Sequence, residues 1–82
     1  SKVIGCFLNP FSDFQLYSFA RDGEIRLWDT QDCGCLKIFH IPGAIDFMDV
    51  IAHPNEPDVL FAAIITEREP TPQYRVVQFD TK

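Results

Sequence analysis

The chain has 82 residues, of which 46% are hydrophobic and 13% aromatic, and its formal net charge is −5. This apolar content excludes a disordered segment, because such segments cannot form a core. The 12 Asp+Glu against 7 Lys+Arg argue against a surface that binds nucleic acid by itself, since phosphate neutralisation needs basic residues. No signal peptide is visible, and no stretch approaches the roughly 20 apolar residues that span a bilayer.

The cysteines predict the redox compartment of the chain, and its first residues predict whether it is part of a larger protein. Three Cys form an odd set without the spacing of a disulfide framework, which favours a reducing, intracellular compartment. The sequence starts with Ser-Lys-Val, without Met, directly at a strand-like run. We therefore expect a segment of a larger protein.

Seven short runs rich in Val, Ile, Leu, Phe or Tyr predict β-strands. In chain order they cover residues 3–8, 15–20, 24–30, 36–40, 45–52, 59–67 and 74–81. All six Pro fall between these runs, where no hydrogen bond of a strand ladder is lost. No window shows a sustained helical period. The sequence therefore predicts an all-β fold.

The strand count predicts one complete unit of four strands over residues 1–41 and a partial, degenerate unit of three strands over residues 42–82. The two units align on their own residues. Leu-Asn-Pro at 8–10 matches Ala-His-Pro at 52–54, and Leu-Trp-Asp at 27–29 matches Gln-Phe-Asp at 78–80. The repeat distance of about 40 to 50 residues falls in the range of β-propeller blades. We expect both units to belong to one larger propeller.

Residues 59–65, Val-Leu-Phe-Ala-Ala-Ile-Ile, are apolar without alternation. This pattern predicts a strand buried on both faces, as in propeller blades that pack face to face. An immunoglobulin-like sandwich is the competing all-β fold. It has less support, because the Cys spacing is wrong and the Trp stands just before an Asp.

Residues 22–29, Asp-Gly-Glu-Ile-Arg-Leu-Trp-Asp, join a turn to a strand. Asp-Gly between two apolar strands is a strong hairpin signal, since both residues tolerate positive φ. Ile and Leu alternate with Glu and Arg along the strand, which then ends in Trp-Asp. The stretch resembles the third strand of a WD-repeat blade.

The resemblance to WD repeats implies a structural hydrogen-bond network within the blade. In that family the network runs from a turn Asp, through a His on the preceding loop, to a strand hydroxyl and the Trp indole. Asp22, Ser18 and Trp28 match three of these members, and the His would lie before Ser1. Leaving a buried indole N–H or hydroxyl unpaired costs about 1–3 kcal/mol, so these residues are expected to stabilise the blade.

Two groups of residues contain side-chain types that occur in catalytic or metal sites. Ser18 lies in a strand interior without a Gly-x-Ser-x-Gly elbow, so the Asp, His and Ser grouping does not predict a hydrolase. Residues 33–35, Cys-Gly-Cys, offer one Cys pair near His40 and His53, whereas a tetrahedral zinc site needs four convergent ligands. We expect a simple turn there, no metal and no cofactor, with Cys6 in the core.

Two surface features have either a structural or a functional interpretation. The acidic, proline-rich turn over residues 67–73 is a solvated connection or a partner contact. His53, which precedes Pro54, is expected at the surface or at a partner.

A closer resemblance rests on residues 8–10, 15–18, 22–29 and 59–70. These residues contain Leu-Asn-Pro, Leu-Tyr-Ser, the strand that ends in Trp-Asp, the apolar strand and the charged Glu-Pro turn. Together these features resemble the early blades of a U3 small-nucleolar-RNA-associated WD-repeat family. That family belongs to the UtpA (t-UTP) subcomplex of the small-subunit processome. The resemblance implies a nucleolar, non-catalytic scaffold in pre-18S ribosomal RNA processing, processome assembly and support of ribosomal DNA transcription. Its implied partners are other protein subunits, pre-ribosomal RNA and U3 RNA, with no membrane and no small-molecule substrate.

Two other functions stay open on the sequence alone, because a fold does not set a function. One is a WD-repeat adaptor in another pathway, such as substrate recognition for ubiquitination. The other is a propeller-based enzyme, which would need convergent charges at the channel mouth, where the first strands are apolar.

Overall fold

The computed structural model describes residues 2–82, which form seven strands. They are β1 (Val3–Leu8), β2 (Gln15–Ala20), β3 (Glu24–Asp29), β4 (Cys35–His40), β5 (Asp46–Ala52), β6 (Val59–Glu67) and β7 (Gln73–Asp80). The predicted all-β fold is confirmed, and every predicted strand end lies within one residue of the observed one. No helix capable of crossing a membrane occurs in this part of the chain.

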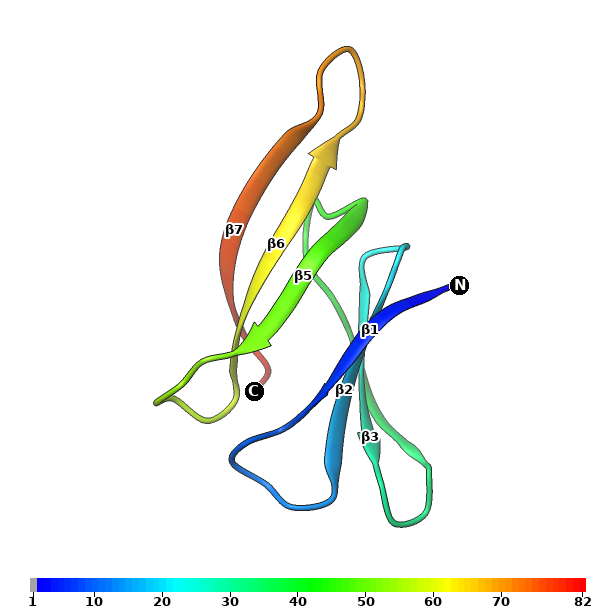
Figure 1. Ribbon diagram of the computed structural model, residues 1–82, viewed down its shortest axis with the longest axis vertical. Helices are drawn as coiled ribbons and strands as arrows, with labels where there is room; N and C mark the ends of the chain where they lie inside the picture. The colour runs from blue at the N-terminus through cyan, green and yellow to red at the C-terminus, as the bar shows by residue number, and fades with distance from the viewer. Residues whose placement is uncertain (1) are drawn as a thin grey trace.

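The strands form two antiparallel sheets with the orders β1-β2-β3-β4 and β5-β6-β7 (Figure 1). Within each sheet, every strand pairs with its neighbour in sequence, since short turns return the chain beside the strand it has just left. The predicted division into four strands and then three is confirmed. One four-stranded sheet and one three-stranded sheet are the arrangement of a WD40 blade followed by most of the next.

The β2–β3 turn of the first sheet contacts the linker that leads to the second sheet, and this contact depends on a glycine. Gly23 has a φ of 82° and donates its N–H to the Ala20 carbonyl at 3.2 Å. A Cβ at Gly23 would lie 2.6 Å from the carbonyl oxygen of Ala44, in the β4–β5 linker. Only glycine therefore combines this left-handed backbone with so close an approach.

The core lies between the two sheets. Phe19 in β2 meets Phe47 in β5 edge to face, with ring centroids 5.9 Å apart. Phe39 in β4 meets Phe79 in β7 in the same way at 5.7 Å. Such pairs contribute about 0.5–1.5 kcal/mol beyond their area burial. Other buried apolar residues are Tyr17, Ile25, Leu27, Ile41, Val50, Leu60, Ala62 and Ile64.

Within the described residues, one face of β6 is buried and the other face is half-buried. Leu60 and Ala62 are at most 1% exposed and belong to the core, whereas Phe61 and Ala63 between them are only half-buried. Side chains of a strand point alternately to opposite faces, and only one face of β6 belongs to the core between the sheets. Cys6 is exposed, so its predicted place in the core is wrong.

Candidate functional site

A hydrogen bond joins β3 to β2 on the outward face of the first sheet. The indole Nε1–H of Trp28 donates to Ser18 Oγ at 2.8 Å. Trp28 is paired with Leu16 across the ladder, so its ring reaches diagonally toward the next outward-facing residue of β2. Ser18 is buried, and the bond satisfies its hydroxyl and the indole together. Of the three residues that the sequence singles out, the structure brings these two into contact.

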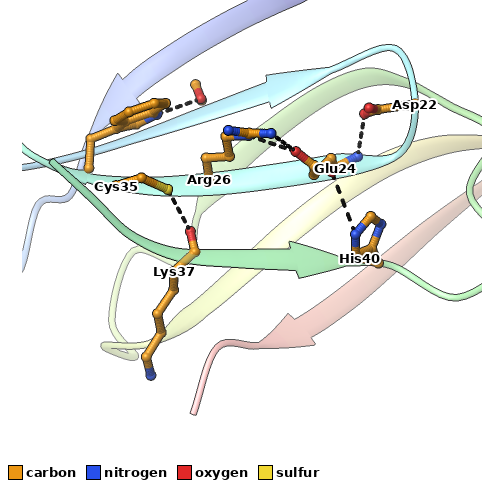
Figure 2. A network of polar contacts seen from close by, with 8 residues as sticks. Asp22, Glu24, Arg26, Cys35, Lys37 and His40 are labelled. Atoms are coloured by element: carbon orange, nitrogen blue, oxygen red, sulfur yellow. Dashed lines mark hydrogen bonds and ion pairs between the residues drawn. The ribbon is translucent and has the colours of Figure 1, made fainter. Parts of the chain in front are cut away.

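Asp22 lies apart from that pair, in the β2–β3 turn. Its carboxylate Oδ1 accepts the backbone N–H of Glu24 at 3.1 Å, which closes the turn (Figure 2). Asp22 is exposed. The His that the WD-repeat resemblance implies between this carboxylate and Ser18 would lie before Ser1, outside the described residues.

A charged cluster lies beside these residues. Arg26 donates Nε–H to Glu24 Oε1 at 2.6 Å, and His40 Nε2 lies 3.6 Å from Glu24 Oε2 (Figure 2). Glu24 and His40 are direct partners in the β3–β4 register. The alternation along β3 places Glu24 and Arg26 on one face, but the sequence alone does not show which residue of β4 faces them.

A hollow of about 200 Å³ opens next to the cluster and the indole. It is lined by Val3, Ser18, Ala20, Glu24, Arg26 and Trp28. Its polar groups already bond to one another, and no buried side-chain nitrogen or oxygen in residues 2–82 lacks a partner. The Trp28–Ser18 and Glu24–His40 contacts join neighbouring strands and stabilise the sheet.

A second polar tie joins the two sheets at Asp46, the first residue of β5. Its carboxylate Oδ2 accepts a hydrogen bond from Arg68 at 2.6 Å and lies 3.5 Å from Arg21, while Oδ1 accepts the Phe47 N–H at 2.8 Å. Arg21 comes from the β2–β3 turn and Arg68 from the β6–β7 loop. Sequence reasoning missed this tie because the two arginines lie 25 and 22 residues away.

The environment of Asp46 favours its ionised form. The side chain is 5% exposed, and this burial opposes ionisation. The hydrogen bonds from Arg68 and Phe47 and the charges of both arginines outweigh burial and lower the pKa of the Asp46 carboxyl below its ordinary value of 3.8. The carboxylate is therefore an ionic link between a turn of the first sheet and a loop of the second.

Tyr17 in β2 and Thr81, just after β7, line the same hollow at the opposite ends of the two sheets. The Thr81 hydroxyl donates to the Asp58 carbonyl at 3.0 Å. Burial and then the charge of Asp58 raise the pKa of the Tyr17 phenol, although a hydrogen bond with Thr81 lowers it. Tyr17 is 2% exposed, so its phenol is a neutral, buried group.

The thiols and His53 have local roles. Cys33, Cys35 and Cys6 are free and exposed, and no three potential metal ligands gather among the residues from Lys2 to Lys82. Cys35 begins β4 and is not part of the turn that the sequence predicts. His53 Nδ1 accepts the backbone N–H groups of two following residues at 3.0 Å, and its ring stacks on Phe61. It closes its own loop.

Two comparisons bear on the identity of the chain. No family model matches it. It is 36% identical over 67 residues to WD repeat-containing protein 75 of Homo sapiens, covering 70% of this chain and 8% of that protein. It is 34% identical over 67 residues to the Xenopus laevis protein of the same name, covering 82% of this chain and 8% of that protein. The chain thus spans about 8% of the length of these curated relatives.

Proposed function

We propose that this chain, a WD-repeat segment similar to WD repeat-containing protein 75, works as part of a non-catalytic scaffold in ribosome biogenesis. The main support is the similarity over 67 residues, which adds to the resemblance of its repeats to the WD-repeat subunits of UtpA. The proposed role is in pre-18S ribosomal RNA processing and assembly of the small-subunit processome. The proposed location is the nucleolus.

The chemistry of the described residues supports a scaffold. Its buried polar side chains have partners within the fold: Ser18 accepts from Trp28, and Asp46 accepts from Arg68 and lies beside Arg21. The contact with Trp28 joins two strands and the contact with Arg21 joins the two sheets, so both stabilise the fold. We propose that residues 1–41 form a complete blade and residues 42–82 most of a degenerate second blade of one larger propeller. Such a ring presents its connecting loops at the surface, where partner proteins contact them.

Affinity purification of the tagged full-length protein tests the proposal. The expected result is co-purification of U3 RNA and UtpA subunits, measured by quantitative reverse transcription and mass spectrometry, together with nucleolar fluorescence. An unrelated WD-repeat protein, tagged and expressed at the same level, is the control. Enrichment of ubiquitin-ligase subunits without U3 RNA would contradict the proposal and favour an adaptor in another pathway.

A further inference from the structure

The loop between β6 and β7 (residues 68–72) extends beyond the end of the second sheet (Figure 1). All of its residues are exposed, and within the described part of the chain none of them takes part in a backbone–backbone hydrogen bond. Blades of a propeller pack through the faces of their sheets, so a loop at the end of a sheet stays at the surface of the ring. An enzyme can therefore draw this loop into its own site without breaking the strand ladder.

Thr71 in this loop has the surroundings of a phosphorylation site. It is the only Ser or Thr in the sequence that precedes a Pro, because the other five prolines follow Asn, Ile, His or Glu. A residue before Pro is held in extended backbone, which is the conformation that fits an enzyme groove. Among residues 2–82 only the carbonyl of Thr71 is hydrogen-bonded, to Gln73 Nε2–H at 3.4 Å. The hydroxyl therefore faces solvent and is available for transfer of a phosphoryl group.

Pro72 indicates which class of kinase the site fits. Its ring nitrogen carries no N–H, so a kinase that bonds the N–H of the residue after the acceptor loses that bond here. A proline-directed kinase offers no partner at that position, and any other residue leaves its N–H unpaired there. Kinases that select basic residues would read Arg68, three residues before Thr71, but Arg68 is already bonded to Asp46. The loop therefore fits a proline-directed kinase.

Arg68 is also placed to respond to a phosphate on Thr71. It is the only Lys or Arg in residues 66–74, and the three residues between the two positions span at most about 10 Å of chain. Its guanidinium donates to Asp46 Oδ2 at 2.6 Å, while the side chain stays 54% exposed. A phosphate carries a charge of about −1.5 to −2 at neutral pH, more than a carboxylate, and accepts two hydrogen bonds from one Arg. The exposed side of Arg68 is thus open to a stronger anion.

We propose that a proline-directed protein kinase phosphorylates Thr71 and that the phosphate draws Arg68 away from Asp46. Asp46 then keeps Arg21, 3.5 Å away, as its partner, and the loop takes a new shape around the phosphate. This inference concerns regulation of a surface loop, so it goes beyond the proposed scaffold function and does not rest on it.

The transfer itself is an ordinary phosphoryl transfer. Thr71 Oγ1 attacks the γ-phosphorus of a nucleoside triphosphate that the kinase binds. The Oγ1–P bond forms, the bond from that phosphorus to the bridging oxygen breaks, and the nucleoside diphosphate leaves with the electron pair. The hydroxyl proton passes to the catalytic Asp of the kinase.

Mass spectrometry of the full-length protein tests the modification. Trypsin cleaves after Arg68 and Arg75 and releases residues 69–75, in which Thr71 and Tyr74 are the only hydroxyl side chains. The expected result is phosphorylation of Thr71 in protein isolated from growing cells with phosphatase inhibitors present. Detection of this peptide in its unmodified form alone, or phosphorylated on Tyr74 alone, overturns the proposal.

Two variants test the class of kinase. The purified full-length protein is incubated with an extract of the same cells and Mg-ATP, and incorporation of phosphate at Thr71 is followed over time. Pro72→Ala should lower the rate about tenfold, because the new N–H is left unpaired in the kinase site. Pro70→Ala, the matched control on the other side of Thr71, should retain most of the rate. An unchanged or higher rate for Pro72→Ala overturns the assignment to a proline-directed kinase.

Phosphorus NMR of the phosphorylated full-length protein tests the exchange of partners. The signal of this phosphate is the one that Thr71→Ala removes. Pairing with a guanidinium favours the dianion, so the second pKa of the phosphate should lie below its usual value of about 6. Arg68→Gln should raise this pKa toward the usual value. Asp46→Asn should lower it further, because it releases Arg68 from its present partner.

Arg75→Gln is the control for charge alone, since Arg75 is exposed and lies four residues after Thr71. It should leave the pKa of the phosphate unchanged. An equal rise in Arg75→Gln and Arg68→Gln, or a pKa that Asp46→Asn does not lower, overturns the exchange of partners. Co-purification of U3 RNA bears on the scaffold function alone, so the two proposals fail separately.

Discussion

The indole of Trp28 and the hydroxyl of Ser18 form a 2.8 Å hydrogen bond that ties β3 to β2. Ser18 is 7% exposed, so its hydroxyl has little access to water as a substitute partner. The Trp-Asp end of β3 is therefore a polar tie within a sheet, and its contribution to stability can be measured.

Trp28→Phe should reduce the free energy of unfolding of the full-length protein by about 1–3 kcal/mol, because it removes the donor to Ser18. The measurement is the urea midpoint. The control is the same substitution in a Ser18→Ala background, where the loss should be smaller since the hydroxyl is already gone. Equal losses in both backgrounds would show that the hydrogen bond contributes nothing.

Gly23→Ala should destabilise the protein more than Gly43→Ala does. Both glycines have a φ of 82°, so alanine is strained at either position by about 1 kcal/mol. Only at Gly23 does the added Cβ also meet backbone, 2.6 Å from the Ala44 carbonyl oxygen, whereas nothing lies within 4 Å at Gly43. Thermal unfolding of the two variants would reveal the difference, and equal shifts would contradict the close contact.

Asp46→Asn should lower stability by about 1 kcal/mol at neutral pH. This is a modest loss for a charge-assisted bond because the Arg21 and Arg68 side chains are more than half exposed. The exposed Asp13→Asn is the control for charge alone. An unchanged unfolding midpoint for Asp46→Asn would show that the ionic link does not hold the two sheets.

The same carboxyl predicts a pH dependence. Its folded-state pKa lies below the ordinary value of 3.8, so its stabilisation is present above that value and is lost as the pH falls through the folded pKa. The stability difference between the wild type and Asp46→Asn should therefore be constant near neutrality and shrink below about pH 4. A difference that shrinks between pH 6 and pH 8 instead would assign the effect to another group.

Phe14→Gly should leave stability unchanged or raise it by up to about 1 kcal/mol. Phe14 has a φ of 65°, a left-handed conformation that costs a bulky residue energy and glycine almost none. Its side chain is mostly exposed, so little burial is lost. Guanidinium unfolding is the measurement, and Phe11→Gly, at a residue without positive φ, is the control that should not gain. A clear loss for Phe14→Gly would mean that the ring packs against another part of the full-length protein.

Most of the fold could be predicted from the sequence because its strand boundaries are local features. Pro and Gly separate the apolar runs, and the Asp-Gly turn fixes one hairpin register. The β6 burial pattern could not be predicted, since Phe61 and Leu60 are equally apolar and only the packed sheet distinguishes their faces. The ties at Asp46 and between Glu24 and His40 depend on contacts across 22 and 16 positions, which no local pattern contains.

The Asp46 carboxylate has a mechanical consequence for the linker between the sheets. This linker spans only residues 41–45, and Gly23 packs closely against it. The next residue, Asp46, forms ion pairs with Arg21 and Arg68. A force applied to one sheet would thus pass to the other and would not be absorbed by bending at the linker. We therefore expect the two sheets to move together as one rigid body, so that a displacement at one end of the first sheet also displaces β7.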